Sequence, residues 1–421
     1  MATMLSAAER RHLEANIRKF YAFRFLVNMQ FWLPIWVTYL IHERGLTIGE
    51  VTALDAPFWL VLVDMEVPTG AIADRYGRRA SLCLGALAQA VAVLVFGLAT
   101  NYVVLLLSYL AWGISFTLFS GADAAFLYDT LKALGRERDY SRIFGRSWAA
   151  MSAGSITGTL LGAPLAAWTN LWFPIVLSSV FVLAAFAVSL SFREPPQTEE
   201  DSAQPGYFAG IKMAALMTWN SPPLRHMIGL SAVIGASCST VFILTQPFLS
   251  RHGVEVGFFG WFLFVGQTVG MAAAVSSHRV TARIGLRTTL VILPLLVMVA
   301  TAGLGSIDHL GAFAFFPLNS LAYAMITPAI SAYINLRVPS AQRATILSFQ
   351  NLVMSLLLAG TEPLVGAVAD HAGMPAGFRV GCLLLAVGAA PFLALWLRAD
   401  RAAPVVGASL PAAAAGPGGA A

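Results

Sequence analysis

The chain has 421 residues, of which 58% are hydrophobic and only 11% are charged, and its net charge is +5. Soluble domains carry about 25% charged residues, so a water-soluble globular protein is excluded. The apolar stretches are continuous rather than alternating, which excludes a membrane β-barrel. No basic tract is interleaved with aromatic residues, so nucleic acid is not an expected partner. We expect an all-α integral membrane protein embedded in the lipid bilayer.

One crossing of the hydrocarbon core needs about 20 apolar residues, and the sequence offers twelve such stretches separated by polar turns. In chain order they are 20–42, 51–72, 80–99, 102–130, 144–168, 171–192, 224–249, 257–277, 287–305, 310–334, 344–368 and 377–398. They predict twelve transmembrane helices in two six-helix bundles.

The polar segments divide the chain further. The expected parts are an N-terminal segment at 1–19, a first bundle at 20–192, a linker at 193–223, a second bundle at 224–398 and a tail at 399–421. Within the linker, a short amphipathic piece at about 207–219 is expected to be helical. The tail is rich in Ala, Gly and Pro, a composition typical of disorder.

The positions of Lys and Arg predict the orientation. If the N-terminus lies inside, only three of the 26 basic residues, Arg44, Arg251 and Arg379, fall in outer connections, and Arg24 falls within a span. Cytoplasmic loops carry the excess of Lys and Arg in membrane proteins. We therefore expect both termini to be cytoplasmic and the protein to lie in the plasma (inner) membrane.

The connection after the second span is the most informative stretch. Residues 66–79 read Glu-Val-Pro-Thr-Gly-Ala-Ile-Ala-Asp-Arg-Tyr-Gly-Arg-Arg. A turn this charged cannot lie in hydrocarbon, and its glycines allow unusual dihedrals and close backbone approach. The residues of this turn that we select as candidates are Gly70, Asp74, Arg75, Gly77, Arg78 and Arg79.

This pattern resembles the loop signature of the major facilitator superfamily, a family of secondary transporters. The loop at 278–287 is similar to a decayed second copy. The resemblance covers about 20–398 and implies two bundles that rock around a central pathway. It also implies that the signature loop holds the cytoplasmic side closed in the outward-facing state. Unlike the drug–proton antiporters of that family, this chain has no Arg in its fourth span.

Ionisable residues inside a span are costly and need an explanation. Four of them project to the inner half of the bilayer, and we expect Arg24 to pair with at least one carboxylate there. The four are Arg24, Asp64, Glu66 and Asp123. The open alternative is a purely structural ion pair that holds two helices together.

Asp123 is the first candidate for proton coupling, because a desolvated carboxyl can exchange protons near neutrality. Glu66, Asp64 and Glu362 are the further candidates. For Glu362 the alternative is a solvated position in an outer vestibule. Asp55 and Asp129 lie near span ends and are expected to be solvated.

A central cavity for an amphipathic solute would be lined by polar and aromatic residues at membrane depth. The candidates are Arg24, Asn28, Trp32, Gln267, Asn319 and Tyr323. The alternative for each is a hydrogen bond between helices.

The sequence contains no phosphate-binding Gly-rich loop, nucleophile motif or Cys/His ligand spacing. We expect no enzyme activity, no metal and no cofactor, with the proton gradient as energy source. The expected function is proton-coupled export of a small amphipathic compound, and a monomer suffices for it. The alternatives are proton-coupled import of a metabolite or metal chelate and, less favoured, a non-transporting receptor or scaffold.

Overall fold

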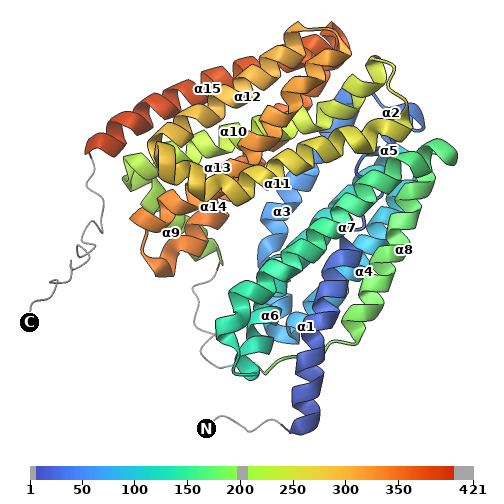
Figure 1. Cartoon of the computed structure of the whole chain (residues 1–421), viewed down its shortest axis with the longest axis vertical. Coiled ribbons are helices and arrows are strands. Elements are labelled where there is room, and N and C mark those ends of the chain that lie inside the picture. Colours follow the sequence, from blue (N-terminus) through green and yellow to red (C-terminus); the bar gives the residue numbers. More distant parts are fainter. Residues whose placement is uncertain (1–5, 197–206, 403–421) are drawn as a thin grey trace, which may run out of the picture.

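The computed structural model describes residues 6–196 and 207–402, in which helices joined by short connections occur and no strand does (Figure 1). A first group of helices comprises α1 (Ala7–Val27), α2 (Trp36–His42), α3 (Ile48–Tyr76), α4 (Arg78–Leu98), α5 (Tyr102–Phe119), α6 (Ala122–Ala133), α7 (Tyr140–Trp168) and α8 (Trp172–Leu190). A second group comprises α10 (Pro222–Arg251), α11 (Phe259–Ile284), α12 (Leu286–Ser306), α13 (Phe316–Arg337), α14 (Ser340–Ala372) and α15 (Met374–Ala402). Short 3-10 turns are η1 (Glu137–Asp139), η3 (Val256–Phe258) and η4 (Leu310–Phe315).

Several predicted boundaries change. The helix expected at 207–219 is confirmed as α9 (Tyr207–Asn220), which packs against α10 and α14. Because α1 begins at Ala7, part of the segment 1–19 is helical, and α15 continues to Ala402. The rest of the predicted tail lies outside the described residues.

Two predicted spans, 20–42 and 102–130, are broken helices rather than continuous ones. α1 ends at Val27, where the Asn28 side chain donates a 2.9 Å hydrogen bond to the Arg24 carbonyl oxygen. α5 gives way to α6 at Gly121, whose φ of +75° is strained for residues other than glycine. A broken helix places helix ends inside the span. The partial charges at these ends can stabilise ionised side chains there.

Within the described residues, nine helical stretches are long and apolar enough to cross a membrane. The α1–α2 stretch, α3 and α7 are not among the nine. α3 and α7 nevertheless have 29 residues each, more than the roughly 20 that one crossing needs.

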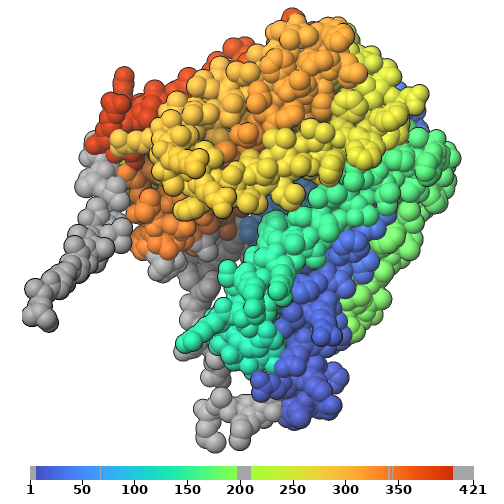
Figure 2. All heavy atoms as spheres, in the orientation of Figure 1, coloured from blue at the N-terminus to red at the C-terminus, as the bar shows by residue number. Residues whose placement is uncertain are grey.

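The chain ends define two faces of the molecule. α1 begins and α15 ends at the face that we call the terminal face, whereas α2 and the start of α3 lie at the opposite, far face (Figure 1). The two groups meet along α3 and α14 and along α7 and α11. Figure 2 shows them in contact toward the far face and diverging toward the terminal face.

The far face is closed by close backbone packing between α3 and α14. The carboxylate of Asp370 accepts hydrogen bonds from the backbone N–H groups of Ile48 (2.9 Å) and Gly49 (2.7 Å), and so caps the first turn of α3. A Cβ on Gly366 would lie 2.0 Å from Oγ1 of Thr52, so only glycine fits at this crossing. The glycine therefore sets how closely the two groups approach.

Candidate functional site

A cavity of about 330 Å³ lies within the second group, lined by α10, α11 and α13. Gln267, Asn319 and Tyr323, three of the predicted cavity residues, are brought together in its wall. Oε1 of Gln267 and Oδ1 of Asn319 are buried and accept no hydrogen bond from any described residue. Beside them stand the rings of Phe242 and Phe316. Unsatisfied carbonyl oxygens next to aromatic rings suit a solute that carries N–H or O–H donors on an apolar body.

Ser239 joins this cavity to a buried carboxyl group. It lines the cavity, and its hydroxyl donates a 2.8 Å hydrogen bond to Oε1 of Glu362 on α14. Oε2 of Glu362 accepts a 3.0 Å bond from the indole Nε1 of Trp59 on α3. Glu362 has no exposed surface, so it does not line a solvated vestibule in this conformation. Both donors, the Ser239 hydroxyl and the Trp59 indole N–H, are neutral. Neither therefore brings a positive charge that would offset the cost of burying a carboxylate.

Asp55 lies one helical turn before Trp59 and is also buried, with an exposed fraction of 8%. Its Oδ2 accepts no hydrogen bond from a described residue, and its charge and that of Glu362 repel each other. The expectation that Asp55 is solvated is therefore wrong, because α14 packs over this part of α3. A proton on either carboxyl would relieve the repulsion.

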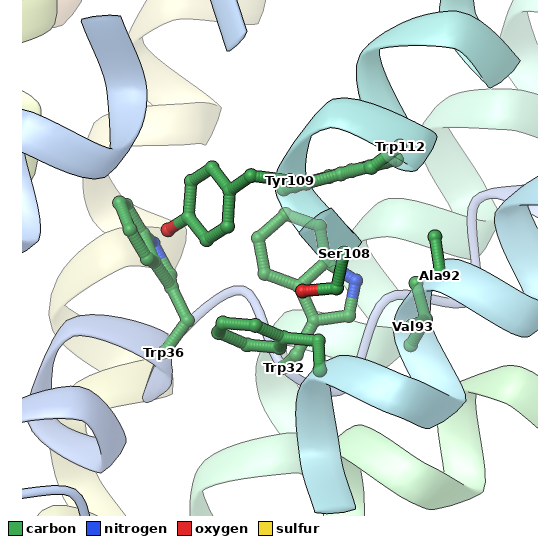
Figure 3. A pocket seen from close by; sticks show the side chains of 8 residues that line it. Trp32, Trp36, Ala92, Val93, Ser108, Tyr109 and Trp112 are labelled. Atoms are coloured by element: carbon green, nitrogen blue, oxygen red, sulfur yellow. The ribbon is translucent and has the colours of Figure 1, made fainter. Parts of the chain in front are cut away.

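An aromatic cluster next to this contact contains Trp32, another predicted cavity residue. Trp32, Trp36, Tyr109 and Trp112 surround a space of about 10 Å³, near the size of one water (Figure 3). The rings of Trp32 and Trp112 meet edge-on with centres 4.7 Å apart. In this conformation Trp32 therefore lies in a packed aromatic core rather than in the wall of the large cavity.

A second cavity, of about 300 Å³, lies between the two groups on the terminal side of Glu362. Trp59 and Glu66 of α3 line it together with Ser348 of α14. Gly70 lies further along α3, and no atom is within 4 Å of the place where its Cβ would stand. The close approach expected at Gly70 is thus absent here, because the two groups diverge on this side.

The expected pairing of Arg24 is present, and its partner is Asp123. Arg24 lies in the last turn of α1 and Asp123 in the first turn of α6, so each charge is stabilised by the dipole of its own helix. The guanidinium also contacts Sδ of Met151 at 3.1 Å and lies 5.7 Å from the ring centre of Trp148. Asn28 lies at the same helix break. Arg24 forms this ion pair and does not line the large cavity. Of the four charges expected at this depth, Arg24 and Asp123 form this pair, whereas Asp64 is exposed.

The signature loop is capped by Glu194, at the start of the linker. Its carboxylate accepts hydrogen bonds from the backbone N–H groups of Arg78 (2.7 Å) and Arg79 (2.8 Å), at the start of α4. Gly77 has a φ of +95°, and a Cβ there would lie 2.7 Å from that carboxylate. Burial raises the pKa of Glu194, and these N–H groups lower it by a smaller amount. Asp74 pairs with Arg78 at 2.9 Å.

The remaining loop residues lie at the surface or nearby. Arg75 is exposed, with its guanidinium 5.6 Å from the ring centre of Tyr76. Asp129, expected to be solvated, is half-buried and lies 3.9 Å from Nε of Arg78. The loop is therefore tied to α6 as well as to the linker.

Three residues of the site were not selected from the sequence: Asp55, Trp59 and Ser239. Asp55, Trp59 and Glu66 are four and seven residues apart, a spacing that places them on one face of a helix. That spacing was the available signal for the α3 contact. Ser239 carries no such signal, because serine is common between membrane helices.

Two solved structures of transporters share this arrangement. The chain superposes on the nucleoside transporter NupG with a TM-score of 0.76 and 12% identity, over 92% of this chain and 99% of that one. It superposes on a bacterial homolog of the human lysosomal transporter Spinster, in its inward-facing and unoccupied conformation, with a TM-score of 0.69 and 17% identity, over 94% and 98%. These likenesses show that the chain shares the fold of these two proteins.

The sequence matches the same class. Residues 20–360 match the family described as Major Facilitator Superfamily, and the chain belongs to that family. It is 23% identical to the uncharacterised MFS-type transporter YxaM of Bacillus subtilis (strain 168), over 87% of this chain and 93% of YxaM.

Two drug-resistance proteins match over a shorter range. Multidrug resistance protein 1 of Bacillus subtilis (strain 168) is 27% identical over 43% of this chain and 45% of its own length. Quinolone resistance protein NorA of Staphylococcus aureus (strain MSSA476) is 24% identical over 48% of this chain and 51% of its own. The match therefore spans about half of each of these relatives.

Proposed function

We propose that this protein exports a small amphipathic compound in exchange for protons, by alternating access. In this proposal twelve helical segments span the inner membrane, with α1–α2 and α5–α6 each counted as one broken span, and both termini are cytoplasmic. The two helical groups then act as the two moving bodies, and one chain is sufficient. The partial match to two drug-resistance proteins favours export.

The substrate would bind in the cavity of the second group. The unsatisfied oxygens of Gln267 and Asn319 would accept hydrogen bonds from it, and the aromatic rings would contact its apolar part. No Lys or Arg lines this cavity among the described residues. We therefore infer a neutral or cationic solute rather than an anionic one.

The observation that carries the coupling is the hydrogen bond from Ser239, a cavity-lining residue, to Glu362. A solute that draws this hydroxyl toward itself would remove a donor from the carboxylate. Glu362 would then take up a proton, and its contact with Trp59 across the two groups would weaken. Asp123 is less suited to this role, because Arg24 already compensates its charge.

The test is accumulation of a fluorescent lipophilic cation in cells, with and without a protonophore. Wild type should lower accumulation relative to an empty vector, and the protonophore should abolish the difference. Glu362→Gln should also abolish it, whereas Glu255→Gln, which removes one carboxylate from an exposed loop, should behave as wild type.

Two outcomes would contradict parts of this proposal. If Asp123→Asn abolishes export while Glu362→Gln does not, the coupling carboxyl is Asp123. If wild type and empty vector accumulate the dye equally, export of lipophilic cations is rejected, and uptake of radiolabelled metabolites or metal chelates becomes the next measurement.

A further inference from the structure

A further cavity near the terminal face is lined by α1, by α7 and by the connection between α6 and α7. It has a volume of about 740 Å³, larger than either cavity described above. Six of its lining residues are basic, against one acidic residue, Glu14. The basic ones are Arg11, Arg18, Lys19, Arg136, Arg142 and Arg146. None of these six basic residues lines either of the two cavities beside the Ser239–Glu362 contact.

Part of this positive charge is not compensated. Asp139 pairs with both Arg136 (3.0 Å) and Arg142 (2.8 Å). Among the described residues, Arg11 and Arg18 form no ion pair, and both are exposed. An uncompensated basic concavity of this size attracts a compact anion, and phosphate groups are those that Arg binds best.

The basic residues of α7 do not lie on the side of the helix that contacts Arg24. Arg142 and Arg146 lie one turn apart on α7, and Trp148, next to Arg24, lies about 160° around the helix from Arg146 at 100° per residue. The basic face is therefore opposite the face that meets the buried ion pair.

The residues that follow the cavity toward the far face are exposed and apolar. Ala22 follows Arg18 by one turn on α1, and Ala149 and Ala153 continue the face of Arg142 and Arg146 on α7. Along both helices, basic residues near the terminal face are followed by apolar surface. This order matches a phospholipid, which has its headgroup at the membrane surface and its acyl chain deeper.

We propose that this basic cavity binds the phosphate headgroup of an anionic phospholipid, with Arg11 and Arg18 as its principal cationic contacts. Each basic residue near an anionic membrane surface contributes about a fivefold gain in affinity. Removing both should therefore weaken binding about 25-fold, before other basic residues compensate.

The test uses the purified full chain in detergent, with phosphatidylglycerol or phosphatidylcholine added, and bound lipid counted by native mass spectrometry. Wild type should retain phosphatidylglycerol in preference to phosphatidylcholine. Arg11→Gln/Arg18→Gln should lose that preference. Lys132→Gln/Arg138→Gln removes the same charge from exposed positions outside the cavity and should retain it.

Three results would overturn the proposal. Equal retention of both lipids by wild type would show no headgroup recognition. Equal loss in the two double variants would show a response to net charge only. Competition by free inorganic phosphate at the concentration of the lipid would assign the cavity to a soluble phosphate instead. Because the readout is binding, failure of the export proposal would leave this result unaffected.

Discussion

The indole N–H of Trp59 donates a hydrogen bond to the carboxylate of Glu362, across the boundary between the two helical groups. The same pair of helices is joined at the far face, where Asp370 caps the first turn of α3. Between the two lies the glycine crossing at Gly366. The α3–α14 contact thus combines a chemical link to the cavity with the packing that closes the far face.

Trp59→Phe should open the far face more often. The variant keeps an aromatic ring but removes the donor to Glu362, and a hydrogen bond to a charged group contributes about 1.5–3 kcal/mol. Such a loss shifts a two-state equilibrium about tenfold or more. The measurement is labelling of Thr52→Cys by an impermeant maleimide, in a background lacking Cys83, Cys238 and Cys382, because Thr52 is buried in the closed contact.

Trp36→Phe is the matched control for that experiment. The indole N–H of Trp36 has no acceptor among the described residues, so its removal should leave the labelling of Thr52→Cys unchanged. Equal labelling rates in the Trp59 and Trp36 variants would show that the bond to Glu362 does not hold the far face closed.

Gly366→Val and Gly70→Val should have opposite effects on the conformation. A side chain at position 366 overlaps Thr52 and the backbone of α3, and such overpacking costs about 1–3 kcal/mol, so the far face should open. Gly70 has open space in this conformation, so valine there is tolerated until the groups close on the terminal side.

Two cysteine reporters distinguish these effects. Gly366→Val should speed labelling of Thr52→Cys, and Gly70→Val should keep Ser348→Cys, in the second cavity, accessible throughout transport. If Gly70→Val leaves transport intact, α3 does not approach a neighbour at this position when the terminal side closes.

The sequence was sufficient for most of the helices, because membrane crossing demands long apolar runs. Ten of the twelve predicted runs each correspond to a single helix in the structure. The sequence was insufficient for the breaks at Asn28 and Gly121. In both stretches the apolar residues continue on the two sides of the break, so the run of apolar residues does not show where the helix ends.

The same limit applies to the site. The pairing of Arg24 could be predicted, because a charge in a span requires a partner. The burial of Asp55 could not, since it depends on α14 lying across α3, more than 300 residues away in sequence. Gln267, Asn319 and Tyr323 could be chosen as polar residues at membrane depth, but only the crossing of α11 and α13 brings them into one cavity.

Asp123→Asn should destabilise the protein more than the double variant Arg24→Gln/Asp123→Asn. Removing one partner leaves the other charge buried and uncompensated, which costs about 3–5 kcal/mol in buried pairs. The double variant leaves no charge to compensate. Thermal unfolding of the three proteins in detergent measures the difference, and a double variant less stable than Asp123→Asn would contradict the assignment.

Asp74→Asn should leave the fold intact but impair transport. In this conformation Asp74 is largely exposed and its ion pair is with Arg78, within the same loop, so its loss should cost about 0.2–1 kcal/mol. In the proposed cycle, however, the signature loop holds the terminal side closed in the alternate state. Dye export with unchanged amounts of inserted protein is the measurement, and unimpaired export would count against this role of the loop.

Glu194 should make the stability of the protein depend on pH. Burial raises its folded-state pKa, so the folded chain holds this proton more tightly than the unfolded chain does. The resulting contribution to stability is present below the ordinary pKa of glutamate and is lost as the pH rises through the raised folded value. Glu194→Gln carries no such proton, so the melting temperature of wild type relative to this variant should fall as the pH rises across that window. A difference that stays constant, or that rises with pH, would mean that the N–H groups of Arg78 and Arg79 outweigh the burial of the carboxylate.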